Sequence, residues 1–398
     1  MTATLTDVQT LIDDCPTGGT VTLPAEVHLD ATSGPLIVDR SMTIHGPSTV
    51  TVTPPATRVS TVVEVTAPNG STVAFRGFDV VGPETPAIDV ALLRWWLPRS
   101  QDATMIVDGL TVSGLFNEVV SRSGGGRCIV TDCDLSGYEK TIAFFSNHGE
   151  PPGELLVSDC VISAGATPKD SSIGMYVHPH MHTTVSRCHF EGWSRYGVYW
   201  NGSPVAQSPT QTITDSTFVD CDLMQSPSGA RPVVTRCTVS RSVPDGPGAT
   251  IRGSADLIDC EFSGYTSLNF AGYQPRAQAR MIGCTFTPSG YAIGFDGDDQ
   301  SRYTMRGCRA VLHPGGRLFT TAQKARCVIN LGDTIVCQDA PTDPQRRWWA
   351  QVQGQVAVVW GDVTVSTPVP RDAWVHGEHS VGAVFLGEPT VMAAGLAP

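Results

Sequence analysis

Lysine is nearly absent from this chain. It occurs only at Lys140, Lys169 and Lys324, and 38 acidic residues against 26 basic ones give a formal net charge of −12 over 398 residues. Nucleic acids and anionic membranes are bound by clustered Lys and Arg. We therefore expect no nucleic-acid partner, and an uncharged or cationic partner such as a neutral glycan fits the charge better.

Long apolar runs are missing as well. No stretch of about 18 apolar residues is present, so we expect no membrane insertion. The N-terminal MTATLTDVQTLIDDC has no basic segment followed by an apolar one, which predicts synthesis in the cytoplasm without a signal peptide. In that reducing compartment the twelve cysteines are expected to be thiols rather than disulfides, and none belongs to a CxxC pair.

Familiar catalytic motifs are also lacking: the sequence has no P-loop, nucleophile elbow or HExxH. We accordingly predict no cofactor and no metal. His178, His180 and His182 alternate as zinc ligands on a strand would, but Pro179 interrupts the flat strand that would place them on one face.

A short internal repeat is the dominant positive feature. Units such as VSDCVISAG, VSRCHFEG and LIDCEFSG recur every 21 to 28 residues, and FRGFDVVG and VDGLTVSG carry the same pattern earlier, with Phe78 and Leu110 in the cysteine place. Alternation of apolar and polar residues predicts a strand with one buried face, with the cysteine and the residue two positions later pointing inward. The repeated position is occupied by Cys133, Cys160, Cys188, Ser216, Cys237, Cys260, Cys284 and Cys308.

A second strand precedes this one in most units, as in SIGMYVH, YGVYWNG and YAIGFDG. Two or three short strands in about 24 residues, closed by Gly, Asn, Asp or Pro turns, predict a coil that stacks on its neighbours at about 4.8 Å. A β-propeller would need four-stranded blades of about 40 residues, and a β-sandwich would not keep one register over ten units. The fold class predicted is all-β, a parallel β-helix.

The opening TDVQTLIDDCPTGGTVTLPAEVHL, followed by SMTIHGPSTVTV, resembles the start of the pectate-lyase-like superfamily of single-stranded right-handed parallel β-helix proteins. The resemblance implies an N-terminal capping helix and first strands in residues 1–40. It further implies parallel coils in residues 41–340 and a β-rich C-terminal cap or association segment in residues 341–398.

The same superfamily contains lyases, hydrolases, epimerases and phage tailspikes, so the fold alone does not give the function. The chain is similar to phage tail β-helix proteins of the minor tail, tail fibre or tailspike type. This resemblance implies a virion tail protein that contacts a bacterial surface polysaccharide and other tail proteins, with or without depolymerase activity, and a homotrimer by analogy with tailspikes. The alternative is a polysaccharide lyase or glycoside hydrolase acting along the β-helix face.

Candidate binding residues lie in the second-strand row. Alignment of IGMYVH with YGVYWN places Tyr176 beside Tyr199 and His178 beside Asn201, and Ser146 precedes them one unit earlier. Flat aromatic faces and hydrogen-bonding side chains at a lateral repeat are typical of a sugar-binding groove. The alternative is structural, because tyrosine stacks and Asn or Asp at turns stabilise coils without any ligand.

Further candidates come from turns near these strands. We predict carbohydrate contacts from His148 in SNHGEPPG and Asp298 in GFDGDDQ, in addition to Tyr176, Tyr199 and Asn201. If the protein is an enzyme, His178 is the predicted acid or base and Asp296 its carboxylate partner.

Two other patterns have both structural and functional interpretations. The residue before each cysteine alternates in sign from Asp159 to Asp259, which predicts a solvated ladder of surface ion pairs rather than catalytic carboxylates. In ALLRWWLPRS, the residues Arg94, Trp95 and Trp96 indicate either contact with a partner or glycan, or local packing.

Overall fold

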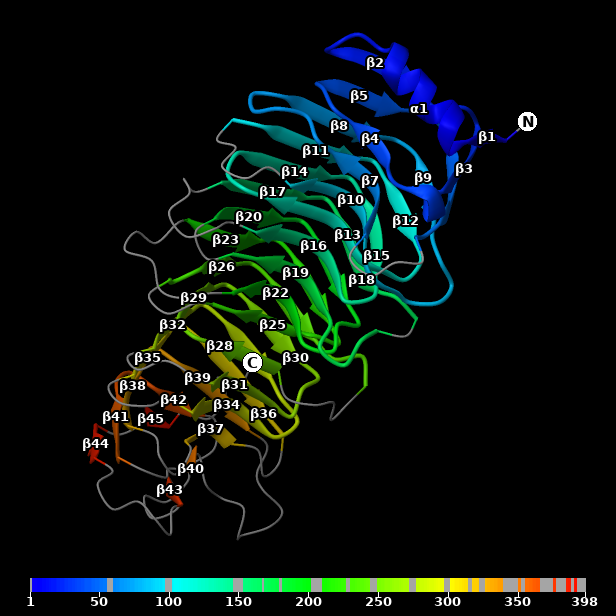
Figure 1. Ribbon diagram of the computed structural model, residues 1–398. Coiled ribbons are helices and arrows are strands. Elements are labelled where there is room, and N and C mark those ends of the chain that lie inside the picture. Colours follow the sequence, from blue (N-terminus) through cyan, green and yellow to red (C-terminus); the bar gives the residue numbers. More distant parts are fainter. Residues whose placement is uncertain are drawn as a thin grey trace. The chain divides into compact units, whose positions relative to one another are not determined.

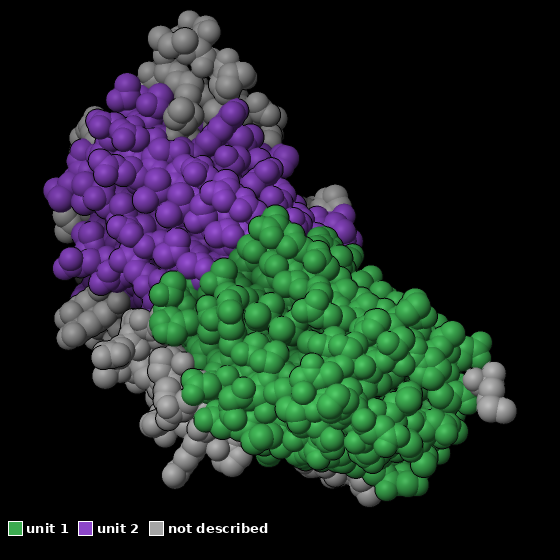
Figure 2. All heavy atoms as spheres, turned by 90° about the horizontal axis from the view of Figure 1, so that it is seen from above, with its two compact units in different colours: residues 1–202, 207–211 green, residues 203–206, 212–398 purple. Residues whose placement is uncertain are grey.

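The computed structural model describes most of the chain in two compact units, residues 1–202 with 207–211 (unit 1) and residues 203–206 with 212–398 (unit 2) (Figure 2). The residues that it describes are 2–55, 60–96, 102–145, 153–166, 168–178, 181–201, 210–226, 230–243, 249–271, 277–296, 301–313, 317–321, 326–338, 350–351, 355–365, 375–376, 384–387 and 390–391.

Each unit is a stack of coils, and a regular coil contributes one strand to each of three parallel sheets, which we call A, B and C (Figure 1). Successive coils pair in register, for example Asp134 with Val161 and Val161 with His189 in sheet A. The predicted all-β parallel β-helix is thus confirmed.

The strands of unit 1 are as follows. Sheet A contains β1 (Ala3–Thr4), β3 (Glu26–Asp30), β6 (Thr49–Thr53), β9 (Asp79–Val81), β12 (Thr111–Ser113), β15 (Asp134–Gly137), β18 (Val161–Ala164) and β21 (His189–Glu191). Sheet B contains β2 (Gly19–Thr22), β5 (Met42–His45), β8 (Thr72–Arg76), β11 (Thr104–Asp108), β14 (Arg127–Thr131), β17 (Glu154–Ser158) and β20 (His182–Ser186). Sheet C contains β4 (Leu36–Val38), β7 (Ser60–Val65), β10 (Ala87–Trp96), β13 (Phe116–Ser123), β16 (Lys140–Phe145), β19 (Ile173–Val177) and β22 (Tyr196–Trp200).

Unit 2 repeats the arrangement. Sheet A contains β24 (Thr217–Val219), β27 (Thr238–Ser240), β30 (Glu261–Ser263), β33 (Thr285–Thr287), β36 (Arg309–Leu312), β39 (Ile335–Gln338), β42 (Thr364–Val365) and β45 (Thr390–Val391). Sheet B contains β23 (Gln211–Thr214), β26 (Val233–Thr235), β29 (Ala255–Ile258), β32 (Gln278–Ile282), β35 (Ser301–Arg306), β38 (Arg326–Gly332), β41 (Gln355–Trp360) and β44 (Val384–Leu386). Sheet C contains β25 (Asp222–Gln225), β28 (Ala249–Arg252), β31 (Ser267–Ala271), β34 (Tyr291–Asp296), β37 (Arg317–Thr321), β40 (Ala350–Gln351) and β43 (Val375–His376).

The helix α1 (Leu5–Asp14) precedes the first regular coil, as the N-terminal sequence predicts. Thr4 begins it with a capping box: the Thr4 hydroxyl accepts from the Asp7 N–H, and the Asp7 carboxylate accepts from the Thr4 N–H at 2.8 Å. Val8 and Ile12 are fully buried. Among the described residues, no helix is long and apolar enough to cross a membrane.

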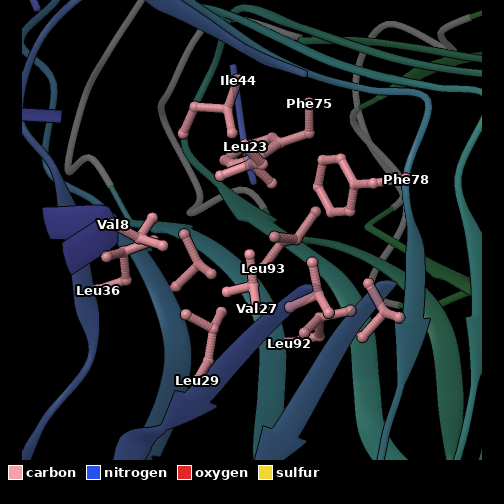
Figure 3. Close-up of a pocket in the computed structure, with 13 residues that line it drawn as sticks. Val8, Leu23, Val27, Leu29, Leu36, Ile44, Phe75, Phe78, Leu92 and Leu93 are labelled. Carbon is pink, nitrogen blue, oxygen red and sulfur yellow. The ribbon is translucent and has the colours of Figure 1, made fainter. Parts of the chain in front are cut away.

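A small apolar cavity of about 30 Å³ lies beneath this helix (Figure 3). Val8 of α1, Val27 of β3, Phe75 of β8 and Leu93 of β10 are among the residues that surround it, and all of its lining is hydrophobic. A dry cavity of this size is common in protein interiors and has no polar group that would hold a ligand.

The cysteine row is buried, as predicted. Its cysteines are free thiols inside the coils, and the residues two positions later are buried beside them. The Cys160 thiol donates to the carbonyl oxygen of Ser158 at 3.1 Å and contacts that of Val130 in the preceding coil at 3.6 Å. The row therefore serves as an internal packing ladder.

The residue before the cysteine makes the turn from sheet B to sheet A, and its backbone is left-handed. In unit 1 this position is occupied by Gly77, Gly109, Asp132, Asp159 and Arg187, with φ between 51° and 64°. Glycine and aspartate tolerate this conformation, whereas a long side chain such as arginine rarely adopts it.

Arginine at this turn is held by an ion pair with the preceding coil. Arg187 donates from Nε and Nη2 to the two carboxylate oxygens of Asp159, both at 2.6 Å, and Arg236 binds Asp215 in the same way at 2.7 Å in unit 2. The hydrogen bonds from Arg187 lower the pKa of Asp159 below its usual value. The predicted surface ion pairs are confirmed at these two places.

We expect Arg187→Gly to be less destabilising than Arg187→Ala by about 1 kcal/mol, because both variants lose the ion pair but only glycine relieves the left-handed strain. Urea denaturation of the two variants measures this difference. At Thr184, an exposed residue in strand β20, the order should reverse, with glycine worse than alanine. Equal effects of alanine and glycine at Arg187 would contradict the strain argument.

Arg122 of β13 is fully buried inside unit 1. Its guanidinium lies 4.5 Å from the ring centroid of Trp95, and Nη2 donates to the carbonyl oxygens of Ala103 and Gly125 at 3.2 and 2.8 Å. Nε and Nη1 make no hydrogen bond with any described residue. Burial lowers the pKa of Arg122 below its usual value, to about 10, so this charge destabilises the folded state.

Replacement of Arg122 by Met should raise the free energy of unfolding near pH 7 by about 1–3 kcal/mol, since a buried, incompletely paired charge is removed and its volume is kept. Because burial lowers the pKa of Arg122 in the folded chain to about 10 and leaves it higher in the unfolded chain, the unfolded chain binds more protons above pH 10 and the wild type should gain stability as the pH rises there. The advantage of the variant should therefore shrink there. Chemical denaturation at pH 7 and above pH 10 tests this.

Arg122→Ala serves as the control, because it leaves a cavity and should destabilise the protein. A loss of stability in Arg122→Met would show instead that the contact with Trp95 and the two hydrogen bonds outweigh the cost of burial.

Candidate functional site

The outer face of sheet C in unit 1 carries the residues that the sequence singles out. Along β19 and β22, half-exposed side chains alternate with buried ones: Tyr176 and His178 flank the buried Val177, and Tyr199 precedes the buried Trp200. The register pairs Tyr176 with Tyr199, and the Asn201 N–H donates to the carbonyl oxygen of Val177. The parallel pairing thus places like positions of adjacent coils side by side.

Five of these residues form what we call the aromatic cluster: Phe145, Tyr176, His178, Tyr199 and Asn201. The rings of Tyr176 and Tyr199 stack with centroids 5.5 Å apart. Phe145 contacts Tyr176 and His178, each at 5.4 Å between centroids, and Tyr176 and His178 are 6.0 Å apart. Three consecutive coils therefore contribute to one surface.

One amide orders both tyrosine hydroxyl groups. The Asn201 Nδ2 donates to the Tyr176 hydroxyl, and the Tyr199 hydroxyl donates to the Asn201 Oδ1 at 3.2 Å. The tyrosines are thus held in fixed orientations before any ligand arrives, which reduces the entropy lost on binding.

The preceding coil places Phe145 beside His178, whereas Ser146, the neighbour expected from the sequence, lies outside the described residues. Phe144 pairs with Val177 and Ala143 with Tyr176, one residue out of step with the alignment expected from the sequence. The reason is burial: Ile142 and Phe144 point into the core together with Met175 and Val177. An aromatic side chain, that of Phe145, therefore lies next to the imidazole of His178.

A charged group that sequence analysis missed borders the cluster. Lys140, at the start of β16, has its ammonium 5.3 Å from the ring centroid of Tyr176. The same ammonium lies 3.5 Å from a carboxylate oxygen of Glu118 and 3.3 Å from one of Glu139. Lys169 also contacts Glu139, at 2.5 Å, so two of the three lysines of the chain lie beside the cluster. The rarity of lysine in the sequence is the feature that could have pointed to this region.

The two glutamates are mostly buried, with side chains 10% exposed at Glu118 and 17% at Glu139. Burial by itself would raise the pKa of Glu139, but the hydrogen bond from Lys169 and the charge of Lys140 outweigh it and lower that pKa below its usual value. Glu139 is therefore a carboxylate at neutral pH, able to accept hydrogen bonds.

The remaining predicted site residues are not brought to this cluster by the described structure. Asp296 ends β34 in unit 2, where its backbone pairs with Ala271, and its side chain lies outside the described part. His148 and Asp298 lie outside the described residues, as does His180. The exposed His182 accepts from the Thr210 N–H through Nδ1 at 3.1 Å.

Aromatic rings, an amide, an imidazole and carboxylates can bind polyhydroxylated molecules, because rings pack on apolar C–H faces and polar groups exchange hydrogen bonds with hydroxyls. Within the described residues, no group of three His, Cys, Asp or Glu side chains is arranged to hold a metal ion. Comparison of the chain with models of protein families, with curated proteins and with solved structures found no significant match.

Proposed function

We propose that this chain is a glycan-binding β-helix protein, and that the aromatic cluster on sheet C of unit 1 contacts the sugar rings. The observation that carries the proposal is the stacked pair Tyr176 and Tyr199, half-exposed on an outer face and ordered through Asn201. A ring fixed in this way offers a flat apolar surface to a pyranose at little entropic cost.

The charged neighbours support the same function. Carboxylates and an ammonium beside an aromatic surface match the alternating acceptors and donors of a sugar, whereas a purely structural tyrosine stack needs none of them. The excess of acidic residues over the whole chain favours a neutral polymer over an acidic one.

We place this binding in a phage tail, where the partners would be a bacterial surface polysaccharide and other tail proteins. Support for this setting comes from the β-helix fold and from the resemblance of the N-terminal sequence and repeats to pectate-lyase-like β-helix proteins, a superfamily that contains phage tailspikes. Parallel coils present identical positions at a regular spacing, which suits a repeating polymer.

Replacement of Tyr176 and Tyr199 by Ala should weaken binding to bacterial surface polysaccharide by at least tenfold, as expected when central aromatic contacts are lost. The double Phe variant keeps both rings and should retain most of the affinity. Val161→Ala on the outer face of sheet A is a control that should bind as the wild type does. Pull-down with purified capsular and cell-wall glycans measures the effect, and unchanged binding by the Ala variant would contradict the proposal.

A second candidate function, glycoside hydrolysis, is favoured by the glutamate pair. Glu118 and Glu139 flank one ammonium next to the aromatic cluster, and paired carboxylates perform acid–base or nucleophilic steps in most glycosidases. The sequence analysis predicts different catalytic residues, with His178 as the acid or base and Asp296 as its carboxylate partner, and this prediction competes with the glutamate pair.

Release of reducing ends from the bound glycan distinguishes these assignments. If the glutamates act, Glu118→Gln and Glu139→Gln should each abolish release, while Asp296→Ala leaves it largely intact and His178→Ala weakens glycan binding without abolishing release at saturating glycan. If the His178 assignment holds, the result should be the reverse, with thermal stability nearly unchanged. A 4,5-unsaturated product detected by ultraviolet absorbance would indicate a lyase, and no product from a glycan that is still bound would exclude both enzymatic assignments for that glycan.

A further inference from the structure

An open cleft lies near the start of unit 1, away from the aromatic cluster. Its volume is about 430 Å³, and it is lined by β7, β10 and the segment that begins with the short 3₁₀ helix η1 (Ala31–Ser33). Clefts of roughly 300–1,000 Å³ accommodate small organic ligands, so this one has room for one or two sugar rings.

Trp96 provides the flat surface of the cleft. It is 57% exposed, more than most large apolar side chains of the chain, whereas its neighbour Trp95 is fully buried. The alternation along β10 therefore turns one tryptophan into the core and the other out to solvent. An exposed indole beside a cleft is a stacking surface for an apolar sugar face.

Arg94 supplies hydrogen-bond donors on the same strand face. Its guanidinium lies 5.4 Å from the centroid of the Trp96 ring, which fixes the direction of the side chain. Its Nε is buried and makes no hydrogen bond with any described residue. A buried donor without a partner is costly. Because Arg94 lines the cleft, the other N–H groups of its guanidinium are the donors that a ligand oxygen would meet.

Glu64 completes the polar wall from the adjacent strand. Register pairs it with Arg94, yet no ion pair between the two side chains is present within the described part of the chain. Both line the cleft, together with Thr32 and Ser33. The Thr32 hydroxyl is oriented by its 2.7 Å hydrogen bond to Asp30. Among the described residues that line the cleft, Arg94 is the one positive group and Glu64 the one negative group.

We infer that this cleft is a second saccharide site, selective for a neutral pyranose. Trp96 stacks on the ring, Arg94 donates to a ring or hydroxyl oxygen, and Glu64 accepts from a hydroxyl. The carboxylate of a uronic acid would be attracted by Arg94 but repelled by the Glu64 carboxylate. The presence of both groups therefore disfavours acidic sugars. The inference rests on the proposed glycan function, but its residues are separate from the aromatic cluster.

The test uses the full chain on an array of neutral hexose oligosaccharides and matched oligouronides, followed by titration of the captured oligosaccharide into the wild type, Trp96→Ala, Glu64→Gln and Tyr176→Ala. We expect capture of neutral oligosaccharides and a blue shift of tryptophan emission when Trp96 becomes covered. Trp96→Ala should lower affinity about tenfold or more and Glu64→Gln severalfold, with unchanged thermal midpoints.

The outcomes separate this inference from the proposed function. If Tyr176→Ala loses binding while Trp96→Ala and Glu64→Gln keep wild-type affinity, the cleft is not a saccharide site and the aromatic cluster remains the glycan contact. The opposite pattern would support the cleft and overturn the cluster as the glycan contact. Preference for oligouronides would overturn the selectivity, and capture of no oligosaccharide would overturn both.

Discussion

The parallel hydrogen bonding between successive coils is the constraint on which the rest of this structure depends. Each described strand pairs with the equivalent strands of the coils before and after it. A side chain therefore has as its lateral neighbours the residues at the same place in the coils before and after it. Burial, charge pairing and aromatic stacking are all decided along these rows rather than along the chain.

This constraint explains the buried cysteine row, the tyrosine stack and the pairing of charged residues in the same way. The inward rows accept small or apolar side chains, and the cysteines fill one of them. On the outer face of sheet C, stacking converts Tyr176 and Tyr199, 23 residues apart in sequence, into a single aromatic surface. The same register sets Arg94 beside Glu64 at the cleft. A β-helix of this kind builds sites by repetition, with each coil adding one or two side chains.

The features that repeat from coil to coil could be predicted from the sequence alone. The period, the buried cysteine row and the pairing of Tyr176 with Tyr199 follow from alternation within units of nearly constant length. What could not be predicted depends on single side chains. Phe145 lies next to His178 because the core selects the register, and Arg122 is buried although arginine is mostly found at surface positions. The contact of Lys140 with two glutamates likewise requires side-chain directions that periodicity does not contain.

The left-handed turn between sheets B and A also limits how the chain can change in length. Where glycine fills the turn, a coil can be duplicated or deleted without a charge penalty. In unit 1, Arg187 follows two acidic turns, Asp132 and Asp159. Deletion of the coil that carries Asp159 would bring Arg187 against Asp132 and preserve an ion pair, whereas duplication of the Arg187 coil would set two guanidinium groups side by side in strained turns. Gain and loss of coils are therefore not equivalent here.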